Sequence, residues 1–564
     1  MSKEEAPKKR ASTTLLLAGA IVVLLVISVF VVWQLSQVQQ QLAEKEKELK
    51  KAEEKLKKAE SELEKTEEQL KRAESELEKA EEEIQKLKKP YELAASVLLR
   101  SKDEVIKDKK YATASSWRLS VYSALLFTPD EKYLVVADYK NRVLCIDTET
   151  GKVVWEKEFP ERMGYSAAVS PDGRYVYLGF RSLEGEITCL EVSTGNVVWE
   201  WKVSEDLGEG DPKSSSWYWP TVYSIQVSPD GKYIYIAAKR QEKRVNYGRV
   251  YCLDASSGKV VWRFPRDEFI DSCIPYSVLS PDAKYFAFHT WYYGKEWGPY
   301  KVVVLDSASG ELVYALDVNK TVLEAFPDSP VKPMTAWHGI DFTGDGKKLV
   351  VVARTGVVLA VDHEESVARK EAVVSKIVRL SAPLPADVIT KENQVIQGFI
   401  YAYTGYIKCA GDYVFVFSSN TYGLAEGVGR VRPALDHPNA SKVFVLDSDL
   451  KLKWMYDMGG KVGYGFNFIG WSADGRIVAV PVGHNWIKMS NDPSGVLVFD
   501  MAKEGTIYDK VVFRYHTEGT TIAAAVSPGG RYVAVIELPI NVAPPGSPVN
   551  VVGEYQVLLF RLKL

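Results

Sequence analysis

The side chains in this chain that are best suited to metal or acid–base chemistry are four histidines. His289 and His484 lie near the ends of predicted strands that follow tight turns, and His338 and His516 lie near the starts of strands that precede them. Imidazoles from several strands can together hold a transition metal. Their spacing fixes no distances, however, so hydrogen-bonded structural histidines are the default interpretation and we predict no metal site.

A second group of candidate residues consists of aromatic side chains in segments between predicted strands. They cluster in SSSWYWP, TWYYGKEWGPY and GHNWIKM, and we predict binding roles for Trp217, Tyr218, Trp219, Trp291, Tyr292, Trp297 and Trp486. Exposed aromatic residues often contact a protein or carbohydrate partner. The alternative is that they pack on one another and order long loops.

Motifs for known catalytic mechanisms are missing from the sequence. It has no nucleophile elbow, no H-E-x-x-H, no glycine-rich phosphate loop, and no C-x-x-C among its five cysteines. Asp147, Asp254, Asp306 and Asp447 recur at one position of a repeat, which indicates turn formation. We therefore predict no catalytic residue and no cofactor.

The elements that must position these residues are revealed by an internal repeat that begins near residue 111. A turn followed by an alternating strand returns as TPDEKYLVV, SPDGRYVYL, SPDGKYIYI and SPDAKYFAF, with degenerate copies at residues 343, 410, 472 and 527. Pro and Asp-Gly favour a tight turn, and the alternation that follows predicts a half-buried strand. A repeat of this length predicts one supersecondary unit per copy.

A second hairpin follows the first in each unit. Its copies include CIDTETGKVVW, CLEVSTGNVVW, CLDASSGKVVW and VLDSASGELVY. This hairpin resembles the tryptophan-docking repeat of PQQ-type, quinoprotein-like propellers, and the first hairpin is similar to YVTN and WD-type repeats. The resemblance implies an all-β head over residues 111–564, an eight-bladed β-propeller or alternatively a seven-bladed one. The vicinal cysteines and acidic calcium site of quinoprotein dehydrogenases are not recognisable.

Propeller geometry predicts which residues close the ring and which face carries long loops. Residues 111–120 are expected to supply the fourth strand of the last blade, which would remove the open edges. The turns within each hairpin are short, and the long insertions fall in the other connections, at residues 206–220, 240–248, 289–300, 324–335, 418–441, 483–495 and 538–553. Long loops on a rigid scaffold commonly carry function, so we assign binding to that face.

The N-terminal region predicts a membrane anchor. Leu15–Trp33 is an almost unbroken apolar run, long enough to cross a bilayer as a helix, and Lys8, Lys9 and Arg10 precede it. The positive-inside rule then places residues 1–13 in the cytoplasm, a transmembrane helix at 14–36, and the rest of the chain outside the cell. A cleaved secretory signal and an archaeal prepilin-type signal are the alternatives.

A charged heptad repeat follows the apolar run over residues 37–89. Leu42, Leu49, Leu56, Leu63, Leu70, Leu77 and Ile84 recur every seven residues, which predicts a long coiled-coil stalk. Glutamates flanking this row oppose a parallel pair, so either an oligomeric coiled coil or a single helix is compatible with the pattern. Residues 90–110, with Leu93, Val97, Leu98 and Val105, are expected to form a helical linker.

Composition and layout together limit the function. With 71 basic and 74 acidic residues and a net charge of -3, nothing favours nucleic acid as a partner. An anchor, a stalk and a globular head resemble the layout of prokaryotic, particularly archaeal, cell-surface proteins. We expect a surface-displayed binding module for an envelope protein or glycan, with a homo-oligomer through the stalk. The alternative is an anchored quinoprotein- or lactonase-like enzyme that uses a small ligand or metal in the central channel.

Overall fold

The structure is a computed structural model of the 564-residue chain. It describes single positions and short runs between 19 and 71, and then residues 90–109, 111, 124–138, 142–243, 245–291, 301–327, 329, 334–458, 469–483, 494–543 and 547–563. The chain divides into two compact units, Met1–Lys88 and Lys89–Leu564. We call the second unit the head.

In the first unit the described residues are helical. Among the described residues, no helix is both long enough and apolar enough to span a membrane. The predicted membrane segment lies partly outside them, as does the second half of the predicted stalk. The heptad leucines that are described, Leu42, Leu49, Leu56 and Leu63, are all helical and about 60% exposed in the single chain. These four leucines are therefore exposed to solvent in the single chain.

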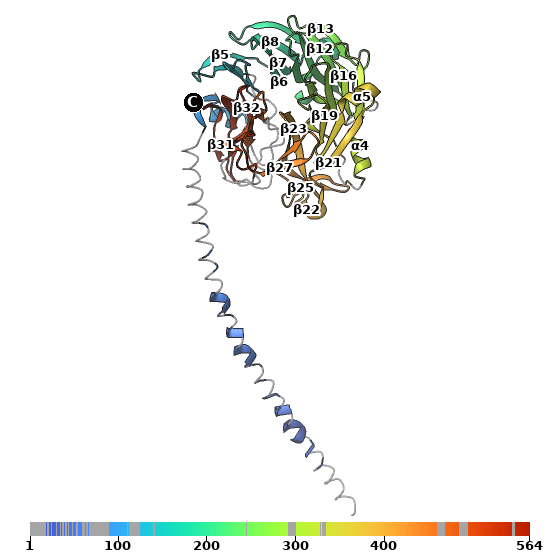
Figure 1. The fold of residues 1–564 in the computed structure, drawn as a ribbon. Coiled ribbons are helices and arrows are strands. Elements are labelled where there is room, and N and C mark those ends of the chain that lie inside the picture. Colours follow the sequence, from blue (N-terminus) through green and yellow to red (C-terminus); the bar gives the residue numbers. More distant parts are fainter. Residues whose placement is uncertain are drawn as a thin grey trace, which may run out of the picture. The chain divides into compact units, whose positions relative to one another are not determined.

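The head is built from consecutive groups of four antiparallel strands, arranged around a centre (Figure 1). The first groups are β2 (Ala124–Phe127), β3 (Tyr133–Ala137), β4 (Arg142–Asp147), β5 (Val153–Glu158); β6 (Met163–Val169), β7 (Tyr175–Arg181), β8 (Glu186–Glu191), β9 (Val197–Lys202); β10 (Thr221–Val227), β11 (Tyr233–Glu242), β12 (Val245–Asp254), β13 (Val260–Phe264); and β14 (Cys273–Leu279), β15 (Tyr285–Trp291), β16 (Lys301–Asp306), β17 (Leu312–Asp317). One bridge, Thr221 to Arg181, joins β10 to β7 of the preceding group.

The later groups follow the same plan. They are β18 (Thr335–Phe342), β19 (Lys348–Ala353), β20 (Val357–Asp362), β21 (Val373–Arg379); β23 (Val395–Ala410), β24 (Tyr413–Ala425), β26 (Lys442–Asp447), β27 (Leu452–Asp457); β28 (Gly470–Trp471), β29 (Ile477–Val482), β30 (Ser494–Asp500), β31 (Val511–Thr517); and β32 (Thr520–Val526), β33 (Tyr532–Leu538), β36 (Tyr555–Leu562) with β1 (Tyr91–Arg100). The predicted all-β head is confirmed, and the arrangement is consistent with a β-propeller.

The turns between the first two strands of a group form as their residues predict. At Ser228 the hydroxyl donates to Asp230 (2.6 Å) and accepts from the Tyr233 amide (2.9 Å), and Gly231 takes a positive φ of 70°. Equivalent Ser–Asp or Thr–Asp pairs close the turns at residues 128, 170, 280, 343 and 472. The Pro-Asp-Gly signal therefore reports turn chemistry rather than a functional site.

The second hairpins dock neighbouring groups together through tryptophan. The indole N–H of Trp199 donates to the carbonyl of Ala255 in the next group (2.9 Å), and its ring lies over Gly258, where a Cβ would come within 2.5 Å. Trp155 and Trp262 make the same bond to Val192 and Ser307. Cys145, Cys189 and Cys252, on the strands opposite these tryptophans, are buried as small apolar side chains.

The prediction of a helical linker at residues 90–110 is wrong. Tyr91–Arg100 is strand β1, which pairs with β36, and the only helix in this described stretch is α2 (Lys102–Lys107). Two register shifts interrupt β1, so its buried residues do not alternate strictly, and the apolar spacing imitated a helix. Pairing with an otherwise open edge outweighs that local pattern.

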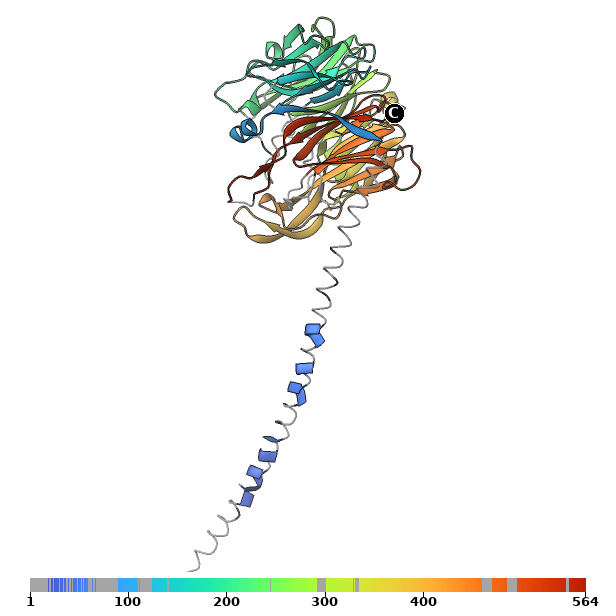
Figure 2. The ribbon, with the colours of Figure 1, turned by 90° about the vertical axis from the view of Figure 1, so that its left-hand side faces the viewer.

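The last sheet is closed by the N-terminal segment of the head, as expected, but not by the predicted residues. Tyr91 pairs with Leu562, so β1 starts where β36 ends, and Figure 2 shows the blue β1 beside the dark red strands. Residues 112–120 lie outside the described residues. Closure through β1 satisfies the backbone groups of β36.

Two faces of the head follow from this order. We call the face with the Ser-Pro-Asp turns the turn face, and the opposite one the loop face. The turn face also carries α5 (His363–Arg369), and the loop face carries the short elements α3 (Ser204–Leu207), η1 (Ser216–Tyr218), α4 (Val318–Ala325) and the hairpin β34 (Ile540–Asn541) with β35 (Val551–Val552).

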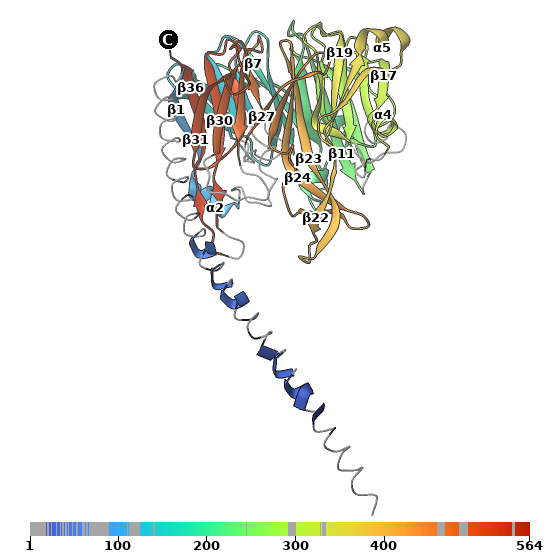
Figure 3. The same cartoon turned by 60° about the horizontal axis from the view of Figure 1, so that its bottom comes forward.

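Two predicted long loops are in fact strands. Residues 240–248 extend the hairpin of β11 and β12, which pair up to Glu242 and Val245. Residues 418–441 contain the end of β24 and β25 (Gly429–Pro433), which combine with β22 (Leu384–Ile389) and the start of β23 in a projection from the loop face (Figure 3). Val388, Ile400, Ala425 and Val431 form a small core inside this projection.

Candidate binding cavity

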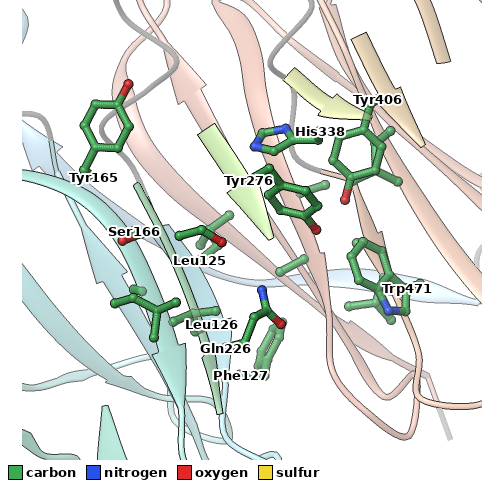
Figure 4. Close-up of a pocket in the computed structure, with 18 of the residues that line it drawn as sticks. Leu125, Leu126, Phe127, Tyr165, Ser166, Gln226, Tyr276, His338, Tyr406 and Trp471 are labelled. Carbon is green, nitrogen blue, oxygen red and sulfur yellow. The ribbon is translucent and has the colours of Figure 1, made fainter. Parts of the chain in front are cut away.

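The centre of the head contains a cavity of about 490 Å³. It is lined by the first strands of successive groups, which we call the inner strands: β2, β6, β10, β14, β18, β23, β28 and β32. Figure 4 shows apolar side chains, including Leu125, Leu126 and Phe127, on one part of the wall and aromatic rings on another. A mostly apolar cavity of this size with a few polar groups is typical of a small-molecule site.

Two tyrosines and a histidine form the aromatic part of the wall. The ring of His338 lies 4.7 Å from that of Tyr276 and 5.4 Å from that of Tyr406, both edge-on. Burial raises the pKa of Tyr276 to about 12 and lowers the pKa of His338 to about 3. All three side chains are therefore neutral near pH 7, and each phenol keeps a proton that it can donate to a ligand oxygen.

A charged pair stands beside these rings. The Lys408 ammonium lies 3.0 Å from Asp341 and 4.4 Å from the centre of the Trp471 ring, which lines the cavity. Burial alone would lower the pKa of Lys408, but the Asp341 carboxylate outweighs it, so the pKa is raised. Asp341 also accepts from the amides of Phe342 (3.1 Å) and Cys409 (2.8 Å). The ion pair is thus held behind Trp471, next to the cavity wall.

The structure brings two of the four predicted histidines together. The Nε2 atom of His289 lies 3.0 Å from the Trp337 carbonyl, and burial lowers the pKa of His289 to about 4. His338 is close enough for His289 to depress its pKa further. His516 belongs to a separate cavity of about 250 Å³ near Tyr456 and Arg514, and His484 lies outside the described residues.

No metal-binding set emerges from the part of the chain that the structure describes. There, three side chains of the His, Cys, Asp and Glu types nowhere converge. Among the described contacts, His289 has its Nε2 atom 3.0 Å from the Trp337 carbonyl, and His338 lies edge-on to two tyrosine rings.

The predicted aromatic residues divide between packing and exposure. Trp217 and Trp291 are half-buried and join a cluster with Tyr165, Tyr223 and Trp337, in which Trp291 meets Trp337 edge-on at 4.8 Å. Tyr218 is exposed, and Trp219 donates its indole N–H to the Asp211 carbonyl of its own loop (2.9 Å). Tyr292, Trp297 and Trp486 lie outside the described residues.

Several lining residues escaped the sequence analysis, although a signal for them exists. The dipeptide Tyr-Ser recurs in inner strands, at Tyr165, Tyr223 and Tyr276, four or five residues before the Ser-Pro-Asp turn. A tyrosine that returns at one position of every inner strand must return around the central axis. Tyr406, Lys408 and Trp471 carry no such repeat signal.

The chemical groups of the cavity wall can be named from its described residues. The wall offers phenol donors, an indole and apolar surface. His338 lies edge-on to both phenol rings, and burial makes its imidazole a weak base by lowering its pKa to about 3. Such a wall is chemically suited to a ligand with an apolar body and acceptor oxygens.

Comparison with known proteins agrees with this fold. The family model described as outer membrane protein assembly factor BamB matches residues 103–223 and 183–275. No curated protein sequence matches the chain significantly.

Several solved structures resemble this chain at low sequence identity. The quinohemoprotein alcohol dehydrogenase from Comamonas testosteroni has 14% identity and a TM-score of 0.49, and the match covers 84% of this chain and 77% of that one. The C-terminal WD40 domain of Sif2 has 12% identity and a TM-score of 0.47, with 84% of this chain and 98% of that one covered. The hydrazine synthase of Kuenenia stuttgartiensis has 17% identity and a TM-score of 0.40, with 77% of this chain and 96% of that one covered. The two matched segments together span residues 103–275, so the similarity to this family is seen over that part of the head.

Proposed function

We propose that this chain is a membrane-anchored, surface-displayed binding module, and that its head is an eight-bladed β-propeller that takes a ligand into the central cavity from the loop face. Eight groups of four strands among the described residues support the blade count. The apolar run Leu15–Trp33 and the preceding basic residues support the anchor and an extracellular head. An envelope protein or glycan is the proposed source of the ligand.

The observation that carries the binding role is the lining of the cavity. Tyr276 and Tyr406 present phenol groups there, Trp471 presents an indole, and the apolar wall includes Leu126 and Ala525. These groups come from separate inner strands of a rigid ring, so they are pre-organised, which lowers the entropic cost of binding. Long insertions at the loop face give a partner its further contacts.

The heptad row supports a stalk that associates with a second copy. The helical leucines from Leu42 to Leu63 that are described are exposed in one chain, and pairing in a coiled coil would bury them. The stalk would then present two or more heads side by side. Paired heads would raise the avidity for a repetitive envelope surface without a new contact.

A cavity-filling substitution tests the binding role. The full chain, in detergent, is incubated with an envelope extract and analysed by native mass spectrometry. Wild type should retain a small ligand, and Ala525→Leu, which adds a side chain on the cavity wall, should lose it. Val154→Leu is the control: it enlarges an exposed side chain of strand β5, outside the cavity lining, and should keep the ligand. Equal retention by both variants, or no adduct on wild type, would contradict the proposal.

A further inference from the structure

Two tyrosines on the wall of the central cavity have hydroxyl groups that remain available to a ligand. Tyr276 of β14 and Tyr406 of β23 both line the cavity. Within the described part of the chain, neither phenol hydroxyl has a hydrogen-bond partner. Burial of a donor without an acceptor costs free energy, so an acceptor oxygen from a ligand would stabilise both groups.

His338 of β18 positions the two phenol rings. Its ring lies 4.7 Å from that of Tyr276 and 5.4 Å from that of Tyr406, and a bridge between β18 and β23 pairs it with Tyr406. Figure 4 shows both hydroxyl groups directed away from His338, on the side of Trp471. The phenols lie close enough for Tyr276 to add to the burial that raises the pKa of Tyr406. Separate inner strands thus hold two donors around one position.

The described lining of the cavity contains aromatic, aliphatic and small polar residues, and no Asp, Glu, Lys or Arg. The imidazole of His338 is neutral near pH 7, because burial lowers its pKa to about 3. An ion that entered this cavity would lose its hydration, and no opposite charge on the described wall would replace it. The lining therefore favours an uncharged ligand.

Cations stand behind two of the lining rings. The Lys408 ammonium, which is paired with Asp341, lies 4.4 Å from the ring centre of Trp471. The guanidinium carbon of Arg181 lies 4.5 Å from the ring centre of Tyr165. Positive charge behind the rings repels a cationic ligand and attracts the partial negative charge of an acceptor oxygen. The aromatic wall is therefore poorly suited to an ammonium compound.

The rest of the cavity is suited to a flat apolar body. Trp471 offers a planar ring beside the two phenols, and Figure 4 shows Leu125, Leu126 and Phe127 on another part of the wall. Planar groups stack well on aromatic side chains. The cavity volume of about 490 Å³ leaves room for a ligand of one or two rings.

We propose that Tyr276 and Tyr406 together donate hydrogen bonds to one carbonyl oxygen of an uncharged ligand, whose planar body lies against Trp471. A carbonyl oxygen has two lone pairs, so it can accept from both phenols at once. The ligand class is then an uncharged carbonyl compound, such as an aryl ketone. This inference rests on the proposed binding function and adds the chemical class of the ligand.

Calorimetric titration with acetophenone and ethylbenzene tests the proposal, because the two probes differ only by a carbonyl in place of a methylene. The full chain in detergent is used at pH 7, and a detergent blank corrects for partition into micelles. Tyr276→Phe and Tyr406→Phe should each weaken acetophenone binding about 3- to 10-fold and leave ethylbenzene binding unchanged. Tyr233→Phe, at a tyrosine that is 38% exposed and outside the lining, should change neither. Equal effects on both probes, or unchanged acetophenone binding, would overturn the proposal.

Charged analogues test the uncharged class. Benzoate and phenyltrimethylammonium should each bind the wild type at least about tenfold more weakly than acetophenone does. Tighter binding of either ion than of acetophenone would overturn the assignment of an uncharged ligand.

Infrared spectroscopy of carbonyl-labelled ¹³C-acetophenone tests whether both donors reach the same oxygen. Hydrogen bonding lowers the stretching frequency of a carbonyl, so the bound probe should absorb below its frequency in hexane. Each single variant should raise the bound frequency part of the way, and the double variant should bring it close to the hexane value. A shift that depends on one tyrosine alone would overturn the shared-oxygen geometry, whereas a tyrosine with only a packing role would leave the shift in place.

The outcomes separate this inference from the proposed binding function. If the envelope ligand is retained by the wild type and lost in Ala525→Leu, but acetophenone does not bind, the carbonyl class is overturned and the binding function stands. If acetophenone binds through both phenols while the envelope extract yields no ligand, the carbonyl site stands and the proposed source of the ligand is overturned.

Discussion

Replacement of a docking tryptophan should show how strongly neighbouring blades depend on one another. Trp262 is 9% exposed, donates its indole N–H to the Ser307 carbonyl (2.9 Å), and lies over Gly310, where a Cβ would come within 2.6 Å of the ring. Trp262→Ala removes the ring and the bond, and should lower the free energy of unfolding by about 3–5 kcal/mol. Trp262→Phe keeps most of the apolar surface but loses the donor, so about 1–3 kcal/mol is expected.

Urea unfolding of the full chain in detergent, followed by tryptophan fluorescence and circular dichroism, measures this difference. Val261→Ala is the matched control, because Val261 is the neighbouring residue of the same strand and 50% exposed. It should change the free energy of unfolding by less than about 0.5 kcal/mol. A loss under about 1 kcal/mol for Trp262→Ala, or an equal loss for Val261→Ala, would refute the view that the tryptophan links adjacent blades.

Three further predictions concern charge and location. Asp341→Asn should lower the free energy of unfolding by up to about 3 kcal/mol, because the ammonium of Lys408 then lacks its carboxylate partner. In the same urea assay, the double variant with Lys408→Met should recover most of this loss. Burial holds the pKa of His289 at about 4 and that of His338 at about 3, so the unfolded chain binds more protons than the folded one. Each histidine should contribute about 3 kcal/mol to the loss of stability from pH 6.5 to pH 4, and pH-dependent unfolding of His289→Gln should lack the share of His289. Deletion of residues 1–36 should move the protein from the membrane pellet to the supernatant, and a full chain already in the supernatant would contradict the anchor.

The fold of the head was predictable because each repeat unit contains the residues that determine its own turns, strands and docking contacts. The Ser-Pro-Asp-Gly turns, the alternating strands and the Trp–Gly docking pairs depend on residues close together in sequence, and all of them form as expected. Position 258 illustrates the point: its positive φ and its contact with Trp199 both require glycine. The turn and the Trp–Gly docking pair inferred from one repeat unit could therefore be checked against the next unit.

The errors fall where the repeat is absent. Residues 91–100 precede the first turn signal, and their apolar spacing alone suggested a helix. Only the open edge of β36, more than 450 positions later, explains why they form a strand. The projection formed by β22 to β25 interrupts one blade, and its strands pair mainly with one another, so no repeat template applies to it.

The candidate site was harder to predict than the fold because a ring brings together residues from different units. His338 and Tyr406 become neighbours through a single bridge between two groups of strands, and a local sequence pattern does not predict that bridge. Long aromatic loops drew attention to Trp217 and Trp291, which are indeed near the cavity, but the groups that give the wall its chemistry are strand residues such as Tyr276 and Tyr406. In a closed ring of sheets, side chains at the same height on successive inner strands face one axis. Lining residues without a repeat signal, such as Tyr406 and Trp471, give this cavity features that the repeat does not determine. The identity of the ligand should therefore depend on these non-repeating residues, and the stability of the ring on the repeating ones.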